Sequence, residues 1–149
     1  MDTSETYIKM CEKATEIQAL APSMQTRIHL SMNIFNCSTK DDSAFFWCMD
    51  TFEDDDLGNS VLTDTVAIWL PRQDQLQKMV FGVSGDIQGQ VWKLYEFVTD
   101  NRATCPRVSS MEQLWLAFVM QEKYSKQWMG EEWAEIKQNT HLTRGDIRK

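Results

Sequence analysis

The chain has 149 residues, a formal net charge of −7 and a sequence pI near 4.8, and 42% of its residues are hydrophobic. This length and composition predict one folded domain at 1–138 followed by a mobile C-terminal tail at 139–149, and they argue against a linker or a disordered protein. The acidic balance argues against direct nucleic-acid binding. The longest apolar run, Leu114–Met120, is far shorter than the ~20 residues of a membrane span, so we expect a cytoplasmic protein with no membrane partner.

The N-terminal part of the chain is predicted to form one helix from Asp2 to Ala21. Apolar residues recur there at the three- and four-residue spacing of one helix face, namely at Tyr7, Met10, Ala14, Ile17 and Ala21. Pro22 then ends the helix, because proline lacks the backbone N–H that a helix interior needs.

Three strands are predicted next. Arg27–Phe35 alternates strictly between polar and apolar residues, which is typical of a half-buried strand. Ala44–Phe52 is rich in aromatic residues, and Val61–Leu70 is rich in β-branched residues. Because the connections are short, we expect a three-stranded antiparallel meander whose second connection, Glu53–Ser60, forms an exposed hairpin tip.

Three or more helices are predicted to follow and to pack on one face of this sheet, which makes the fold class α+β. The first helix spans Arg72–Phe81, and Arg72, Gln73, Asp74 and Gln75 are interpreted as the polar start of that helix. The second spans Gln90–Thr99, with one apolar side expected at Val91, Leu94, Tyr95 and Val98.

The last predicted helix begins at a capping box, Ser109–Glu112, and runs to about Lys126. Leu114–Met120 is apolar on every side, so this helix is expected to be the central core element. Trp128–Trp133 is expected to be a turn between two tryptophan anchors.

The most distinctive feature of the sequence is the stretch from Asp41 to Pro71, which contains no Lys or Arg. Its eight acidic residues are Asp41, Asp42, Asp50, Glu53, Asp54, Asp55, Asp56 and Asp64. A concentrated negative charge on an ordered scaffold attracts cations or basic protein surfaces. We therefore predict a partner-binding surface made of Asp50, Glu53, Asp54, Asp55, Asp56 and Asp64.

Other interpretations of these acids stay open. A calcium loop starting at Glu53 would have Gly58 at the sixth position and Asp64 at the twelfth, but Leu57 occupies a position that should supply an oxygen. A loose divalent-ion site at Asp54 and Asp56 is a further alternative. The simplest alternative is a solvated, mutually repelling turn, which is what runs of like charge usually form.

Nucleophilic catalysis finds little support in the sequence. There is no Gly-x-Ser-x-Gly motif, and the two histidines are His29 on a predicted polar strand face and His141 in the predicted tail. The four cysteines are widely spaced, so we expect small buried hydrophobic side chains rather than a zinc site or disulfides: Cys11, Cys37, Cys48 and Cys105. We predict no catalytic residue, metal ligand or cofactor, and the sequence leans away from an enzyme.

Three segments of the chain resemble a family of small proteins encoded by bacteriophages and prophages. They are Trp69–Gln77, Ser110–Met120 and Trp128–Trp133, and the opening Tyr7–Ala14 is also similar. The middle of the chain, Pro22–Thr65, takes no part in this resemblance. The resemblance implies an origin in a mobile element and no assigned activity. Small acidic phage proteins include inhibitors of host defence systems, some of which mimic nucleic acid.

These observations together favour a non-enzymatic protein that binds a basic host protein or nucleoprotein complex in the host cytoplasm. The partner would be a complex that handles nucleic acid, and the protein would act as an anti-CRISPR-like inhibitor or a nucleic-acid mimic. The alternatives are a small enzyme with a carboxylate-bound metal and a structural or oligomer-forming phage component.

Overall fold

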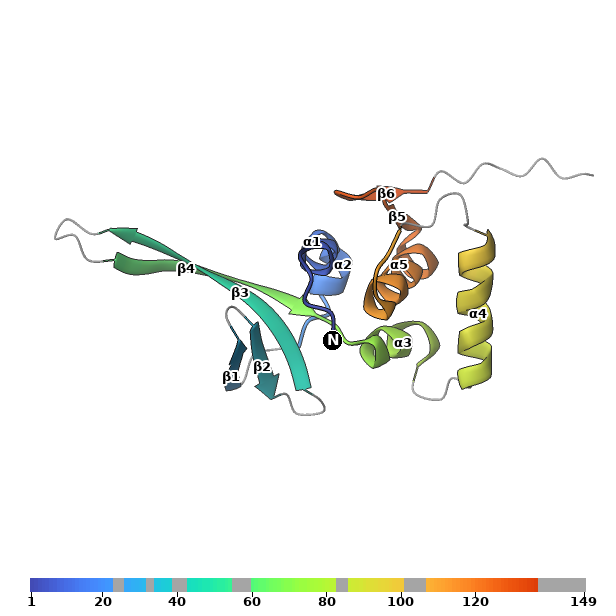
Figure 1. Ribbon diagram of the computed structural model, residues 1–149, viewed down its shortest axis with the longest axis horizontal. Helices are drawn as coiled ribbons and strands as arrows, with labels where there is room; N and C mark the ends of the chain where they lie inside the picture. The colour runs from blue at the N-terminus through green and yellow to red at the C-terminus, as the bar shows by residue number, and fades with distance from the viewer. Residues whose placement is uncertain are drawn as a thin grey trace, which may run out of the picture.

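Five helices and six strands occur in the part of the chain that this computed structural model describes, which is residues 1–22, 26–31, 34–38, 43–54, 60–82, 86–100 and 107–136 (Figure 1). Four strands form an antiparallel sheet in the order β1-β2-β3-β4: β1 Thr26–Ser31, β2 Ile34–Ser38, β3 Ser43–Asp54 and β4 Ser60–Leu70. The short strands β5 Lys126–Trp128 and β6 Trp133–Glu135 form a second antiparallel sheet. The helices are α1 Glu5–Lys13, α2 Thr15–Gln18, α3 Gln73–Phe81, α4 Ile87–Asp100 and α5 Met111–Tyr124. The predicted fold class, α+β, is confirmed.

The predicted three-stranded meander is wrong because the segment Arg27–Phe35 contains a chain reversal. Ser31 at the end of β1 lies opposite Ile34 at the start of β2, so one predicted strand is two paired strands. Strict alternation of apolar and polar residues shows that a segment is extended, but it does not show where the segment folds back. Asn36–Ser38, which the sequence places between two predicted strands, belongs to β2 and pairs with β3.

The predicted N-terminal helix is divided at Ala14, whose backbone dihedrals of φ −84° and ψ 69° are not helical. The helix begins at Glu5 rather than Asp2, because Ser4 is the N-cap and its hydroxyl accepts a hydrogen bond from the Tyr7 N–H. The predicted buried face is confirmed at Tyr7, Met10, Ala14 and Ile17, which are fully buried. Periodicity therefore identified the face correctly but not the break.

Helix α5 is the central element of the core, as predicted. Its residues from Trp115 to Met120 are all buried, and Trp115, Phe118 and Phe81 make aromatic contacts with one another. The N-cap lies one residue later than predicted, at Ser110. The Ser110 hydroxyl accepts a hydrogen bond from the backbone N–H of Gln113, which takes the third helical position in place of Glu112. The β5–β6 turn carries the two predicted tryptophan anchors, since Trp128 pairs with Trp133 across it with ring centroids 5.1 Å apart.

The helices are arranged beside the four-stranded sheet rather than in one layer across a face of it (Figure 1). Helix α1 packs against β4, whereas α3 and α4 pack against α5 beyond the end of β4. The predicted arrangement of three helices on one sheet face is therefore not observed. One consequence is that only the inner part of the β3–β4 hairpin enters the core.

Candidate functional site

Strands β3 and β4 form a ribbon that extends well away from the helices (Figure 1). They pair from Phe45 opposite Leu70 at the inner end to Asp54 opposite Ser60 at the outer end. At the inner end the side chains are buried: Ala44, Phe46 and Cys48 from β3, and Ile68, Trp69 and Leu70 from β4. The register shifts between Thr51 and Phe52, and an irregularity of this kind increases the local twist of a ribbon. The outer part, residues 49–54 with 60–65, is called the acidic ribbon below.

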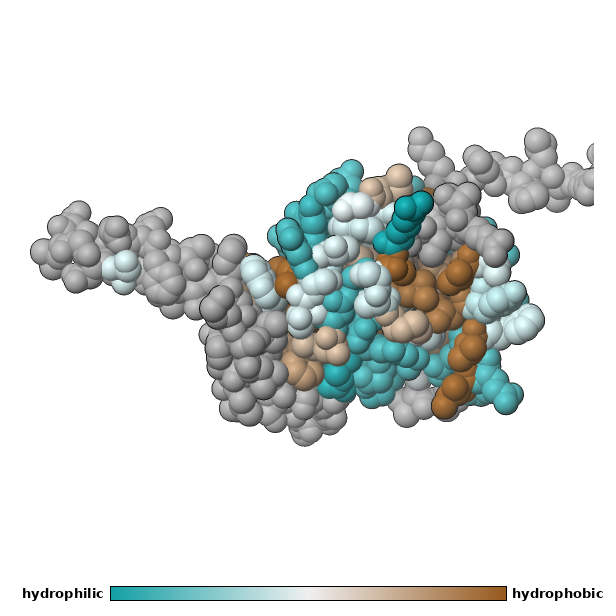
Figure 2. Space-filling model, in the orientation of Figure 1, coloured by the Kyte–Doolittle hydropathy of each residue, from teal (hydrophilic) through white to brown (hydrophobic). Residues whose placement is uncertain are grey.

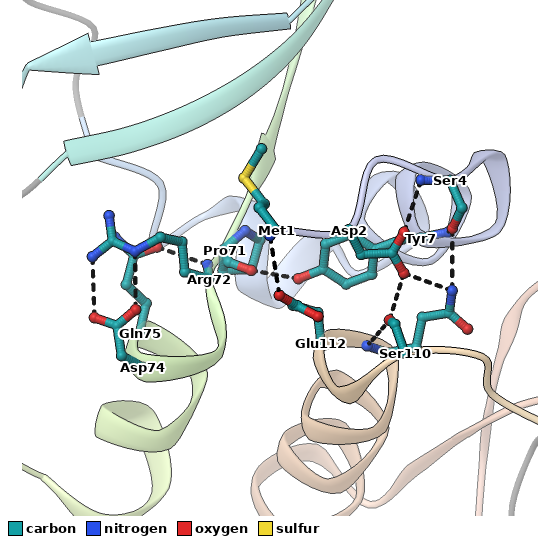
Figure 3. A network of polar contacts seen from close by, with 11 residues as sticks. Met1, Asp2, Ser4, Tyr7, Pro71, Arg72, Asp74, Gln75, Ser110 and Glu112 are labelled. Atoms are coloured by element: carbon teal, nitrogen blue, oxygen red, sulfur yellow. Dashed lines mark hydrogen bonds and ion pairs between the residues drawn. The ribbon is translucent and has the colours of Figure 1, made fainter.

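The inner end of the ribbon is attached to the helices by side chains of α1 and α2. β4 is an edge strand, and Gln18 occupies its free edge at Trp69: the Gln18 Oε1 accepts the Trp69 N–H at 2.9 Å, and the Gln18 Nε2 donates to the Trp69 carbonyl at 3.0 Å. The Tyr7 hydroxyl donates to the Pro71 carbonyl at 2.5 Å (Figure 3). The Gln18 amide takes the place of a neighbouring strand. At the base of the ribbon, β4 is therefore held by β3 along one edge and by Gln18 along the other.

Four of the six predicted partner-binding acids lie within the acidic ribbon. Asp50 lies opposite Thr65, Asp64 opposite Thr51, Glu53 opposite Val61 and Asp54 opposite Ser60. Asp55 and Asp56 lie outside the described residues, as do Asp41, Asp42 and Leu57–Asn59. The prediction that the acids share one hairpin is thus confirmed for the backbone positions of these four residues.

No basic residue occurs between Asp41 and Pro71 in the sequence, so nothing on the two strands counters these charges. The first basic residue after the ribbon is Arg72, and it forms a two-point contact with Asp74, with Nε to Oδ1 at 2.9 Å and Nη2 to Oδ2 at 3.1 Å (Figure 3). The interpretation of these residues as a helix start is confirmed, because Arg72 is the N-cap of α3 and its N–H donates to the Gln75 side chain.

A polar network joins the first residues of the chain to the start of α5 (Figure 3). The Asp2 carboxylate accepts hydrogen bonds from the Ser4 N–H at 2.8 Å, the Ser110 hydroxyl at 2.5 Å and the buried Gln113 amide at 2.7 Å. Burial raises the pKa of Asp2, but these hydrogen bonds outweigh that effect, so the pKa lies below its ordinary value of 3.8. The network is structural, because each donor and acceptor is used to connect α1 with α5.

This network predicts a pH dependence of stability. The carboxylate of Asp2 has a lower pKa in the folded chain than in the unfolded chain, so its contribution is fully present above pH 3.8 and is lost as the pH falls through the lower folded value. We expect the free energy of unfolding of the wild-type protein to fall more steeply from about pH 5 to about pH 2 than that of Asp2→Asn. Urea unfolding at a series of pH values measures both slopes, and equal slopes would show that Asp2 does not contribute.

Two buried ionisable groups, Tyr7 and Cys11, lie next to this network and are held in their neutral forms. Burial raises the pKa of the Cys11 thiol and that of the Tyr7 hydroxyl well above their ordinary values, so both groups are neutral at physiological pH. Cys11 and Cys48 are buried, which confirms the predicted burial of these two cysteines. The side chains of Cys37 and Cys105 lie outside the described part of the structure.

A second surface was not identified from the sequence. On α4 the side chains of Ile87, Val91, Trp92 and Tyr95 are 76%, 60%, 62% and 60% exposed, whereas Leu94 and Phe97 are buried against α5. The apolar side that the sequence predicts for this helix is therefore only partly buried, at Leu94 but not at Val91 or Tyr95. The signal was present in the number of apolar residues, since α4 has more of them than one buried side can accommodate.

Among the described residues no three His, Cys, Asp or Glu side chains are grouped so that they could hold a metal ion. The calcium-loop alternative at Glu53–Asp64 and the loose ion site at Asp54 and Asp56 include residues outside the described part, so both stay untested. No described helix has the length and hydrophobicity needed to cross a bilayer.

Comparisons with protein-family models, with curated proteins and with solved structures gave no match. The resemblance of Trp69–Gln77, Ser110–Met120 and Trp128–Trp133 to phage and prophage proteins therefore stays a prediction. The functional proposal below rests on the ribbon and its charge.

Proposed function

We propose that the protein is a non-enzymatic binding protein whose acidic ribbon docks into a basic groove of a partner that handles nucleic acid. The observation that carries this proposal is a two-stranded ribbon that extends beyond the core and has acidic residues but no basic ones along its length (Figure 1). A partner of this kind would be a basic host protein or nucleoprotein complex in the cytoplasm, and occupation of its groove would inhibit it, as an anti-CRISPR-like protein does.

The spacing of the charges supports mimicry of nucleic acid. Along β3, Asp50 and Asp54 are four residues apart, which corresponds to ~13 Å at ~3.3 Å per residue of strand. Glu53 lies within this distance, and so does Asp64, because it pairs with Thr51. Four charges whose outer members are ~13 Å apart have a mean spacing of ~4.4 Å, somewhat wider than the ~3.4 Å between charges along one strand of duplex DNA. The ribbon thus offers a basic groove a linear charge density of the same order as that of one phosphate backbone.

The width and anchoring of the ribbon support the same mode of binding. The backbones of two paired strands lie ~4.8 Å apart, and a two-stranded ribbon is slender enough to fit the ~12 Å wide major groove of B-DNA, so it can enter a protein groove of nucleic-acid size. The base is held by Gln18 and Tyr7, so less freedom is lost when the ribbon docks than for an unattached loop. An affinity based on many like charges should depend strongly on salt.

Reversing charge on the ribbon tests this proposal. The protein is used as bait in a lysate of the host at low ionic strength, and bound proteins are eluted with salt. The affinity of the recovered partner is then measured for the wild type and for Glu53→Lys/Asp54→Lys. We expect this variant to bind at least about tenfold more weakly and to show a shallower dependence of affinity on salt, because charge reversal introduces repulsion at the contact. Duplex DNA should compete with the wild-type protein for the partner.

The matched control is Glu122→Lys/Glu132→Lys, which changes the net charge equally at exposed acids on α5 and on the β5–β6 turn. This control should retain most of the wild-type affinity. Equal loss in both variants would mean that net charge, not the ribbon, governs binding, and unchanged binding by the ribbon variant would refute the proposal.

Isothermal titration with Ca²⁺, Mg²⁺ and Mn²⁺ tests the metal-enzyme alternative, which saturable heat at one site would favour.

A further inference from the structure

The outer face of α4 is an apolar surface at the end of the molecule opposite to the acidic ribbon (Figures 1 and 2). Its four large side chains are Ile87, Val91, Trp92 and Tyr95, each at least 60% exposed. Three of them lie four residues apart, so they form one row along the helix, with Trp92 beside it. These four residues are called the α4 face below.

The α4 face is held in a defined shape. On the inner side of the helix, Leu94 and Phe97 are buried, and the Phe97 ring lies 5.3 Å from that of Phe118, which fixes the side of α4 that faces outward. On the outer side, the Trp92 Nε1–H donates to the Glu96 carboxylate at 2.8 Å, and the Trp92 ring lies 5.9 Å from that of Tyr95. The polar atom of the indole is thereby satisfied within the helix, and its apolar surface is presented without a large loss of side-chain freedom on binding.

We infer that the α4 face mediates a two-fold dimer of this protein. Aromatic side chains present ~150–250 Å² each, so the exposed parts of the four side chains amount to on the order of 400 Å², within the range of the largest apolar patches on monomers. Two copies bring together on the order of 800 Å² of apolar side chain. Because apolar area makes up about 65% of a homodimer interface, this corresponds to a total on the order of 1,200 Å², the lower end of the range for specific interfaces.

The pattern of residues indicates that a second copy of the chain binds the α4 face. A two-fold contact uses the same surface on both copies, so the surface must complement itself. Ile87 and Tyr95 lie four residues on either side of Val91, so an antiparallel pair of α4 helices centred on Val91 places each Tyr95 against the Ile87 of the other copy and leaves the smaller valines at the axis. None of the four residues is charged, so no carboxylate opposes another at the centre of the contact, and the Glu96 carboxylate that accepts from Trp92 lies beside it.

Dimerisation through α4 would leave the acidic ribbons free at the two outer ends. Each copy carries its ribbon at the end away from α4 (Figure 1). If the proposed function of the ribbon holds, the dimer binds two grooves at once and gains avidity without new contacts. The dimer itself does not depend on that proposal.

The test is sedimentation of the full chain at concentrations up to about 100 µM, with Val91→Glu and the matched control Met129→Glu. Met129 is an exposed apolar residue on the β5–β6 turn, 65% exposed, so both variants add one carboxylate to the surface. We expect the wild type and Met129→Glu to form dimers, and Val91→Glu to dissociate at least about tenfold more readily, because two like charges meet at the axis. Added salt should strengthen the wild-type dimer by screening the net repulsion.

A wild type that stays monomeric throughout this range overturns the inference, as does a dimer that persists unchanged in Val91→Glu or an assembly of more than two copies. A monomer that uses the α4 face to bind a different protein overturns it as well. Glu53→Lys/Asp54→Lys should keep the dimer, so failure of the α4 inference and failure of the ribbon proposal give different results. Circular dichroism and urea unfolding of each variant confirm that the fold is retained.

Discussion

Replacing Trp115 with alanine is expected to lower the free energy of unfolding by about 3–5 kcal/mol. Trp115 is 1% exposed in the middle of α5, and its ring contacts those of Phe81 and Phe118 at centroid distances of 6.2 and 5.6 Å. Truncation would remove the largest fully buried side chain and leave a cavity at the place where α3 and α5 pack together. Urea unfolding followed by far-ultraviolet circular dichroism measures the change.

The conservative variant Trp115→Phe should cost much less than alanine. The indole Nε1 of Trp115 is buried and has no hydrogen-bond partner among the described residues, and an unsatisfied buried donor costs about 1–3 kcal/mol. Phenylalanine removes this donor while it keeps an aromatic ring, so the two effects partly offset each other. Met129→Ala, on an exposed turn residue, should stay within about 0.5 kcal/mol of wild type. A loss of less than about 1 kcal/mol in Trp115→Ala would mean that α5 is not the centre of the core.

Replacing Gln18 with methionine is expected to lower the free energy of unfolding by about 2–3 kcal/mol. Methionine has a similar shape but can replace neither the hydrogen bond that Gln18 accepts from the Trp69 N–H nor the ones that it donates to the Trp69 and Cys11 carbonyls, which are 2.9, 3.0 and 3.0 Å long. Both Trp69 backbone groups would then lie unpaired at the edge of β4, next to a buried side chain.

Amide hydrogen exchange at Trp69 distinguishes loss of these bonds from a general loss of stability. The Trp69 N–H should exchange faster in Gln18→Met than in the wild type by more than the global change in stability explains. The exchange rates of amides within α5 should rise only by the amount that the global change in stability explains. If the Trp69 amide and the α5 amides accelerate equally, Gln18 supports the fold as a whole and does not serve as the edge partner of β4.

The candidate ribbon was largely accessible from the sequence because both of its signals are local. Charge composition marks the stretch Asp41–Pro71, and β-branched and aromatic content marks the two strands, so the acids Asp50, Glu53, Asp54 and Asp64 were placed on one hairpin before the structure was known. The extension of that hairpin beyond the core could not be predicted from the sequence. It depends on where α1 stops covering β4, and that is a property of packing between distant segments.

The α4 face was missed for a related reason. A hydrophobic pattern tells which residues share a side of a helix, but α4 carries apolar residues on more than one side, and only its neighbours determine which side is buried. Leu94 and Phe97 are buried, whereas Val91 and Tyr95 are exposed although the sequence places them on the same apolar side as Leu94. The displaced cap at Ser110 has a similar origin, because Gln113 is drawn into the network with Asp2 and Ser4.

The sequence by itself determined the α+β class, the buried faces of α1 and α5, and the concentration of acid without base between Asp41 and Pro71. These features depend on periodicity and composition, which act over a few neighbouring residues. Only the tertiary structure decided that Arg27–Phe35 folds back on itself, that Gln18 completes the edge of β4, and that α4 presents an apolar face at the far end from the ribbon. Each of these depends on contacts between residues far apart in the chain, and the free energy that selects among them is that of burial and hydrogen bonding in the assembled core.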